Sequence, residues 1–266
     1  MPLNRRKRKK PLRNIIRPIA NSPDPVVSVV IPVKNEKNTI RSVIWQASRV
    51  HPQTEVIVVA NGSTDSTNRI AASMGARLID IAYPLGHDVG RSIGAREARG
   101  KIILFIDGDI VIPARELVPF VQAVEKGADV ALNRYQGYKT GRNVHDVVLA
   151  KHALNILLNR VNLGGCSMTT IPHALSRKAL NTIGAENLSV PPKAHAMAIA
   201  KGLNVQPVHY VNVGRKNARR RRQAETEQIK KMIVGDHLEA IHWLVSATNP
   251  RGFMTDLNRI REVIRW

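Results

Sequence analysis

Residues 101–110, KIILFIDGDI, run from an apolar stretch directly into two carboxylates. The apolar part is typical of a buried strand, because β-branched, aliphatic and aromatic side chains follow one another without a polar break. Asp107 and Asp109 come next, and alternate residues of an extended chain share one face. Two carboxylates that close repel each other unless a positive charge lies between them. The stretch therefore predicts either an Asp-Gly turn or a site for a divalent cation such as Mg²⁺ or Mn²⁺.

Further strands of this kind alternate with segments of helical spacing through the first half of the chain. Strands are predicted at 26–33, 55–60, 77–81, 101–106 and 128–135. Helices are predicted within 38–50, 63–75, 87–100 and 113–127, three of which end at a glycine. This alternation is typical of an α/β fold with a mostly parallel sheet and helices on both of its faces. In such sheets ligands bind beyond the carboxyl ends of the strands, which is where the two aspartates lie.

The pattern changes after about residue 140. We expect a helix at 143–160, an extended stretch and short helix at 164–180, and a strand within 203–213. From Ala218 the chain is predicted to be helical in three pieces, broken at Gly235 and again at 248–252. The apolar faces of the last two pieces are expected to pack on the sheet domain, with a membrane-surface role as the alternative. These faces comprise Leu238, Ile241 and Val245, then Leu257, Ile260 and Ile264.

Basic residues outnumber acidic ones by 41 to 20, which gives a formal net charge of +21. Such a surface attracts nucleic acid, anionic lipid or a phosphorylated substrate. Two basic runs stand out, one within residues 1–17 and the other, GRKNARRRR, at 214–222. We divide the chain into a disordered basic arm (1–24), a main domain (25–215), and a basic loop with C-terminal helices (216–266). The arm is expected to tether the protein to an anionic membrane or polymer, and the 214–222 loop either closes on a phosphate or attracts a polyanion.

Two features bear on the compartment. Cys166 is the one cysteine, so no disulfide forms within the chain, which fits a reducing environment. No segment approaches the ~20 apolar residues that span a bilayer, and the short apolar stretch behind the basic N-terminus contains Arg17. We therefore expect a cytoplasmic protein, with a peripheral position at the inner face of the membrane as a further option.

Four loops and helices occur in a distinctive order. PVKNE (32–36) follows the first strand and NGSTDST (61–67) the second, then come GRSIGAREARGKII (90–103) and LFIDGD (104–109). Taken together, at these spacings, they resemble the family 2 glycosyltransferases, which have the Rossmann-like GT-A fold. The resemblance covers residues 26–132. It implies a nucleotide-binding half (25–132), an acceptor half (133–215), and a helical C-terminal extension beyond them.

The resemblance also implies a chemistry. The family transfers a sugar from a nucleotide-diphospho-sugar to a glycan or lipid-linked acceptor, with Mn²⁺ or Mg²⁺ and with inversion at the sugar. A match of motifs gives the nucleoside contacts to Pro32, Asn35, Glu36 and Asn61, a donor-side arginine to Arg91, and the ribose and metal–diphosphate to Asp107 and Asp109. The cation would neutralise the leaving diphosphate, which is the main catalytic need. His209 follows the strand where relatives of this fold sometimes place a metal-ligating histidine.

Two departures from the family pattern affect the site. Ala60 and Asn61 stand where the family usually has an acidic residue, which leaves the nucleotide preference open. An inverting enzyme also needs a general base, and Val190 and Pro191 occupy the place of the usual Glu-Asp pair, a dozen residues before Gly202. The substitutes are Glu186, His195, Asp236 and His237, each with a structural alternative: a histidine on a helix face, or an aspartate capping a helix.

Three hypotheses follow. The first is a metal-dependent glycosyltransferase acting on a glycan or lipid-linked acceptor of the cell envelope. The second keeps the fold but binds a nucleotide-sugar or a polyanionic glycan without transfer, because the acid pair is missing. The third is a basic nucleic-acid-binding protein, whose affinity would fall steeply with salt. Charge alone supports the third, and a chain with 4% aromatic residues offers few side chains for base stacking.

Overall fold

The computed structural model describes residues 17–137, 144–214 and 223–261, and within 223–225 the backbone alone. Its centre is a mixed sheet in the order β3-β2-β1-β4-β6-β5-β7. The strands are β1 (Val27–Val33), β2 (Thr54–Asn61), β3 (Arg77–Ile81), β4 (Ile102–Phe105), β5 (Val130–Asn133), β6 (His173–Ser176) and β7 (Val205–His209). All neighbouring pairs are parallel except those of β6, which runs antiparallel to β4 and β5. The predicted mostly parallel sheet is confirmed.

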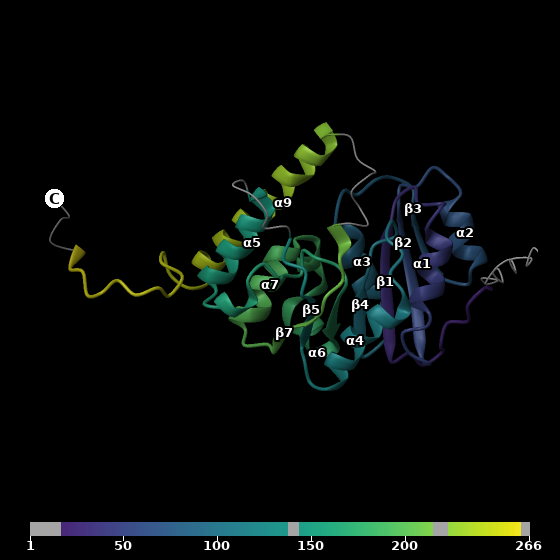
Figure 1. Cartoon of the computed structure of the whole chain (residues 1–266), viewed down its shortest axis with the longest axis horizontal. Coiled ribbons are helices and arrows are strands. Elements are labelled where there is room, and N and C mark those ends of the chain that lie inside the picture. Colours follow the sequence, from purple (N-terminus) through teal and green to yellow (C-terminus); the bar gives the residue numbers. More distant parts are fainter. Residues whose placement is uncertain (1–16, 138–143, 215–222, 262–266) are drawn as a thin grey trace, which may run out of the picture.

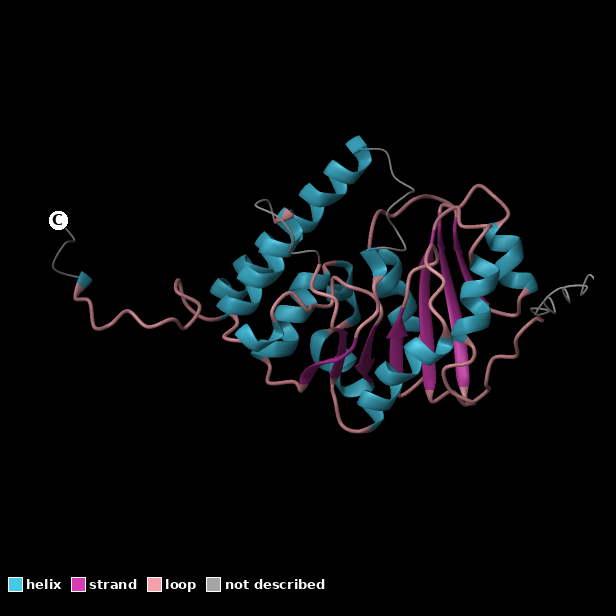
Figure 2. Cartoon of the chain, viewed as in Figure 1, coloured by secondary structure: helices cyan, strands magenta, loops and turns pink. Residues whose placement is uncertain are grey.

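Helices cover both faces of this sheet (Figure 2). They are α1 (Ile40–Ala47), α2 (Thr67–Ser73), α3 (Val89–Glu97), α4 (Ala114–Glu125), α5 (Asp146–Leu157), α6 (Arg177–Ile183), α7 (Pro191–Ala200) and α9 (Gln223–Ala247). The described residues also form two short 3₁₀ helices, η1 (Val161–Leu163) and η2 (Ala185–Ser189). Successive β1 side chains alternate between the layers: Val29 and Ile31 pack with α1 and α4, and Val30 packs toward α3.

Helix α3 lies unusually close to the sheet because its inner face carries glycines. A Cβ added to Gly94 would come within 2.3 Å of a Val30 methyl carbon, and one added to Gly90 within 2.9 Å of Pro32 Cβ. Glycine is the residue that permits such an approach. The prediction placed the end of this helix at Gly100, but the helix ends at Glu97. Gly100 instead packs against β1, where a Cβ would lie 2.7 Å from the Ser28 nitrogen.

The segment that precedes β1 is attached to the amino end of the sheet. The Ile19 N–H donates to Met74 O (2.8 Å), the Ser22 N–H donates to Thr54 O (3.0 Å), and Asn21 Oδ1 accepts from the Val56 N–H (2.8 Å). Residues 17–24 therefore differ from the disordered arm predicted for 1–24, because backbone and amide groups dock them on β2 and α2. Residues 1–16 of that arm lie outside the described residues.

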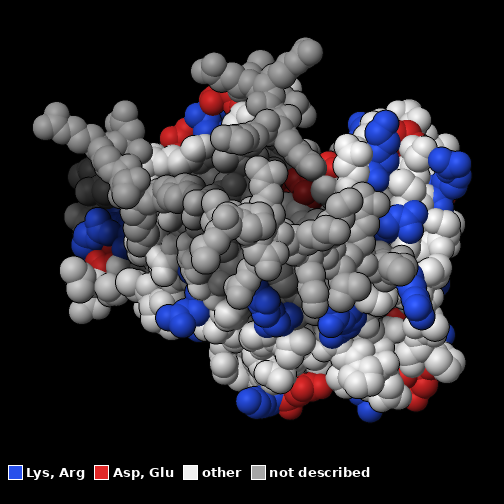
Figure 3. Space-filling view, turned by 45° about the vertical axis from the view of Figure 1, so that its right-hand side comes forward, with Lys and Arg blue, Asp and Glu red and all other residues white. Residues whose placement is uncertain are grey.

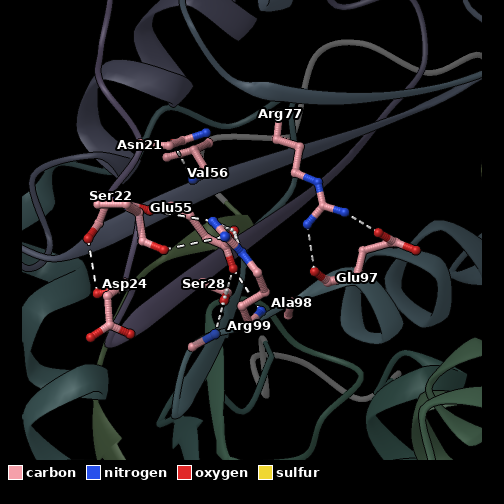
Figure 4. A network of polar contacts seen from close by, with 12 residues as sticks. Asn21, Ser22, Asp24, Ser28, Glu55, Val56, Arg77, Glu97, Ala98 and Arg99 are labelled. Carbon is pink, nitrogen blue, oxygen red and sulfur yellow. Dashed lines mark hydrogen bonds and ion pairs between the residues drawn. The ribbon is translucent and has the colours of Figure 1, made fainter.

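A buried carboxylate organises the same end of the sheet (Figure 4). Glu55, on β2, accepts hydrogen bonds from Ser28 Oγ (2.6 Å), the Arg99 backbone N–H (2.7 Å) and the Arg99 guanidinium (3.1 Å). Ser28 Oγ in turn accepts from the Gly100 N–H (2.7 Å). The Glu55 side chain is fully buried and that of Arg99 is 52% exposed. Both carboxylate oxygens accept hydrogen bonds, Oε1 from Ser28 and the Arg99 N–H and Oε2 from the Arg99 guanidinium. A carboxylate can be buried only when its oxygens are satisfied in this way.

The C-terminal region differs most from prediction. Helix α9 continues through Gly235 and packs across α5 and α7, at the end of the sheet away from α1 and α2 (Figure 1). Its buried stripe is His237, Ala240 and Leu244, while Leu238 of the predicted face is 63% exposed. The predicted last helix is not formed in residues 250–260: Leu257 and Ile260 are exposed, and Ile264 lies outside the described residues. None of the helices in the described part of the chain has the length and apolar character needed to cross a membrane.

Replacing Arg99 with alanine should lower the free energy of unfolding by about 2–3 kcal/mol, because it leaves the buried Glu55 carboxylate without its guanidinium partner. Arg77→Ala is the matched control. Arg77 pairs with Glu97 in the same region, but both side chains are substantially exposed, so its loss should cost less than ~1 kcal/mol. Urea unfolding of both variants measures the difference, and equal losses would contradict the role given to Glu55.

Candidate functional site

A cavity of about 410 Å³ opens where the carboxyl ends of β1, β2 and β4 meet. It is lined by the last residues of β1 and β2, by the segments that follow β1 and β4, and by the start of α3 with the loop before it. The lining residues are Pro32, Val33, Lys34, Glu36, Asn61, Pro84, Gly86, His87, Asp88, Gly90, Arg91, Asp107, Gly108 and Asp109. On the face shown in Figure 3, acidic side chains lie inside a hollow beside a lobe that carries Lys and Arg. The position agrees with the rule that ligands of such sheets bind beyond the carboxyl ends.

Most of the predicted donor-site residues meet in this cavity. Six of them line it: Pro32, Glu36, Asn61, Arg91, Asp107 and Asp109. Sequence reasoning missed the loop before α3, which contributes Pro84, Gly86, His87 and Asp88. The dipeptide His-Asp just ahead of the α3 glycines was the available signal, and it was treated as the start of a helix rather than as part of the site.

The Asp-Gly-Asp stretch forms a tight turn at the edge of the cavity. Two hydrogen bonds hold Gly108: its N–H donates to Pro32 O (3.3 Å) and its carbonyl accepts from Thr39 Oγ1 (2.8 Å). A Cβ on Gly108 would lie 2.6 Å from a Val33 methyl carbon, so only glycine fits against β1 here. The turn and the cation site, which were alternatives in the sequence, are compatible in the structure, because the turn delivers both Asp107 and Asp109 to the cavity wall.

Asn35 is not among the lining residues. It has a left-handed backbone (φ 57°), its N–H donates to Ser63 Oγ (3.1 Å), and its Oδ1 accepts from the Thr64 N–H (2.8 Å). Asparagine tolerates this conformation better than most residues. Asn35 therefore joins the loop after β1 to the loop after β2, next to the cavity rather than in it.

Asn61 lines the cavity, but its amide is already engaged. Its Nδ2 donates to Gly86 O (2.7 Å), and its Oδ1 accepts from the Leu85 N–H. Both ends of the side chain thus hold the loop that carries Pro84 to Asp88. An amide satisfies this loop as a carboxylate could not, because it both donates and accepts.

Arg91 lies between two carboxylates at the base of the cavity. One terminal nitrogen is 2.8 Å from Asp88 Oδ1, and the other is 3.2 Å from Asp107 Oδ1. Burial works against the charged form of Arg91, but Asp88 and Asp107 outweigh it and raise its pKa. Burial raises the pKa of Asp88, Arg91 opposes the rise, and Asp107 adds to it. The Arg91 side chain is 8% exposed, so its charge acts within the cavity rather than on the surface.

The charged lining leaves the cavity negative. Four carboxylates (Glu36, Asp88, Asp107 and Asp109) face two cations (Lys34 and Arg91), an excess of two negative charges in a chain of net charge +21. Within the described residues, no three His, Cys, Asp or Glu side chains form a ready-made metal site. A cation here would rest on Asp107 and Asp109 and complete its shell with oxygens of a bound phosphate or water, as Mg²⁺ and Mn²⁺ commonly do. The charge and the donor set both fit a divalent cation.

His195, predicted as a base, lies in the interior. It is fully buried on α7, with Nε2 2.8 Å from Asn155 Oδ1, and Nδ1 has no hydrogen-bond partner among the described residues. Burial, then His237, Arg160 and Lys151, lower its pKa to about 3. It does not line the cavity, so the structural alternative holds. His237 is also buried, with its pKa lowered to about 4 by burial.

The remaining candidates are also dispersed. Glu186 is exposed on η2, where its carboxylate accepts from Asn187 Nδ2 (3.3 Å), and it does not line the cavity. His209 stands edge-on to Phe120, with ring centroids 6.2 Å apart, and it is not among the residues that line the cavity. Asp236 is half-buried on α9, and burial, then Asp88 and Glu239, raise its pKa to about 6. The charge of Asp88, which lines the cavity, thus contributes to the raised pKa of Asp236.

The sequence profile of the family described as "Glycosyl transferase family 2" matches residues 28–184. Glucosyl-3-phosphoglycerate synthase of Mycolicibacterium paratuberculosis is 35% identical over 106 residues, which cover 36% of this chain and 32% of that protein. 4,4'-Diaponeurosporenoate glycosyltransferase of Staphylococcus haemolyticus is 25% identical over 146 residues, covering 52% of this chain and 37% of that protein. The matched part of this chain spans about a third of the length of these curated relatives.

Solved structures extend the likeness beyond the matched sequence. The crystal structure of Mycobacterium tuberculosis glucosyl-3-phosphoglycerate synthase with Mn²⁺, uridine diphosphate and glucosyl-3-phosphoglycerate aligns with a TM-score of 0.61. It is 21% identical, and the alignment covers 81% of this chain and 80% of that one. Another crystal structure of that enzyme, with Mn²⁺, UDP-glucose and phosphoglyceric acid, has a TM-score of 0.59. At this identity the likeness bears on the fold, and it confirms the predicted GT-A architecture.

Because His195 is buried in its neutral form, the free energy of unfolding should fall at acid pH. The unfolded chain takes up a proton below its ordinary pKa of about 6.5 and the folded chain does not, so stability falls as pH drops from about 6.5 toward 3. Between pH 7 and pH 5 this histidine should remove about 2 kcal/mol from the free energy of unfolding. His195→Gln should shrink the loss by that amount, and His242→Gln, at an exposed position of α9, should not change it. Urea unfolding at the two pH values provides the measurement, and an unchanged loss in His195→Gln would mean that the imidazole is protonated in the folded protein.

Proposed function

The chain belongs to glycosyl transferase family 2, as its ordered loops predicted, and from this premise we propose that it transfers a sugar from a nucleotide-diphospho-sugar donor to an acceptor hydroxyl. The observation that carries the proposal is the negative cavity with Asp107 and Asp109 in its wall, within the matched residues 28–184. A diphosphate would be repelled by this cavity on its own, so the proposal includes a divalent cation, Mn²⁺ or Mg²⁺.

We assign roles to the lining residues on that basis. Asp107 and Asp109 would hold the cation, which when bound would neutralise the charge that develops on the leaving diphosphate. Pro32 and Glu36 form the nucleoside side of the cavity, and Arg91 positions the diphosphate through its terminal N–H groups. Asn61 acts indirectly, because its amide holds the loop before α3. His209 has no place in this scheme.

A uridine diphosphate sugar is the first donor to test. It is what the solved relative binds with Mn²⁺, and the loss of the usual acidic residue at Ala60–Asn61 is why other nucleotides belong in the panel. The acceptor is proposed to be a glycan or lipid-linked sugar, with phosphoglycerate, which the same relative binds, as the competing candidate. We also propose a cytoplasmic location, supported by Cys166, a buried free thiol.

We propose inversion at the transferred sugar, with Asp236 as the general base. Pro191 begins α7 and Val190 precedes it, so the usual acid pair has no counterpart at that place. Burial, and then the charge of Asp88, raise the pKa of Asp236 to about 6, which suits a base at neutral pH. The same gap in the family pattern supports the second hypothesis, a protein that binds the donor without transfer, and the experiments below separate the two.

Calorimetric titration should detect binding of uridine diphosphate in the presence of Mn²⁺. Asp109→Asn should weaken that binding at least ~30-fold, because one of two carboxylate ligands is lost. Asp80→Asn, an exposed aspartate on β3, makes the same charge change and should leave binding unaltered. Absence of metal-dependent binding to any nucleoside diphosphate or nucleotide-sugar would overturn the donor site. Binding of these ligands that does not need the metal and weakens only with added salt would favour the nucleic-acid hypothesis.

Turnover, once a donor and acceptor are found, should depend on a base that titrates near pH 6. The rate is expected to fall as pH drops below about 6, and Asp236→Asn should reduce kcat at least ~100-fold. Asp146→Asn, at a surface aspartate of α5 that pairs with Lys230, makes the same charge change and should retain the rate. Proton NMR of the product gives the anomeric configuration. Retention of configuration would overturn both inversion and the role of Asp236, and donor binding without turnover would support the non-transferring protein.

A further inference from the structure

Asp88 lies in the cavity wall, and the scheme above gives it no contact with the donor or the cation. It ends the loop before α3 with a left-handed backbone (φ 63°), which aspartate and asparagine adopt more readily than most residues. Its side chain is 17% exposed, and its Oδ1 is 2.8 Å from an Arg91 terminal nitrogen. The close approach of α3 to β1 fixes both partners near the Asp-Gly-Asp turn. Asp88 is therefore a largely buried carboxylate beside the proposed diphosphate position.

Arg91 is shared between two acids that differ in exposure. Asp88 and Asp107 contact different terminal nitrogens of the guanidinium, at 2.8 Å and 3.2 Å. The Asp107 side chain is 34% exposed and faces the cavity as part of the turn, whereas Asp88 is nearly enclosed. The positive charge of Arg91 is therefore largely neutralised before any anion arrives, and Asp88 accounts for the closer of the two contacts.

The charge of Asp88 has a direct consequence for anion binding. With it, the lining carries an excess of two negative charges, and without it the excess would be one. A buried arginine released from one of its two carboxylates would also present more of its charge to a phosphate. Asp88 thus opposes binding of a bare diphosphate, and the opposition is removed when a divalent cation balances the cavity.

We propose that Asp88 is a positioning residue that acts through Arg91 to make diphosphate binding depend on the divalent cation. This rests on the proposed function of the cavity and adds a selectivity to it: the site accepts the metal complex of a nucleoside diphosphate and discriminates against the free anion. The quantity that expresses the discrimination is the ratio of the two dissociation constants, which is a coupling between metal and nucleotide.

The test measures that ratio by calorimetry on the full chain, with uridine diphosphate titrated in the presence and in the absence of Mn²⁺. In Asp88→Asn the ratio should fall about tenfold, within the usual range for two ligands coupled through shared charges. The change should come mainly from tighter binding without the metal. Asparagine suits this position because it tolerates a left-handed backbone and retains an oxygen that accepts from Arg91.

A second variant and a control keep the result interpretable. Asp88→Gly also fits the backbone and removes the charge, but it leaves Arg91 without support, so it should lower the ratio and also weaken metal-dependent binding. Asp24→Asn makes the same charge change at the opposite end of β1 and should keep the native ratio.

The outcomes separate the two levels of the proposal. Metal-dependent binding in the native chain with an unchanged ratio in both Asp88 variants would overturn this inference and leave the donor site standing. Equal weakening with and without Mn²⁺ would also overturn it, since that is what a purely structural role produces. Failure of the native chain to bind uridine diphosphate with Mn²⁺ would overturn the donor site and this inference together.

Discussion

The close contact between α3 and β1 is the constraint on which the cavity depends. Gly90 and Gly94 carry no side chains where α3 crosses β1, so the helix backbone lies close to Val30 and Pro32. That approach brings Arg91 within reach of the carboxylate that follows β4. A single methyl group at Gly94 would overlap Val30 and displace α3. Arg91, which lies on α3, would then lose its position relative to Asp107.

The two ends of the sheet treat buried acid–arginine pairs differently. At the amino end, Glu55 accepts hydrogen bonds from Ser28 and Arg99, and the result is a closed, structural contact. At the carboxyl end, Arg91 Nε has no hydrogen-bond partner among the described residues, and the pair opens onto a cavity. Saturated polar groups stabilise a fold, and incompletely satisfied ones are typical of places where a ligand binds.

Much of the architecture could be predicted from the sequence, because continuous β-branched apolar runs and glycines at helix ends are local signals. The Asp-Gly-Asp stretch was expected at the carboxyl edge because it follows a strand, and Arg91 was expected there from the resemblance to the family; both line the cavity. The base candidates were less predictable, since nothing local distinguishes a buried histidine such as His195 from one in a cleft. Asp88 was missed because its role depends on how closely α3 approaches the sheet. Gly235 was predicted to break a helix, but packing of α9 on α5 and α7 outweighs its weak helix propensity.

The attachment of residues 17–24 fixes the place where the chain enters the domain. These residues dock where β2 begins and α2 ends, whereas the cavity lies where β1, β2 and β4 end. The two features are thus separated by the length of the strands. A domain held at residues 17–24 would therefore keep its cavity one strand length away from the point of attachment.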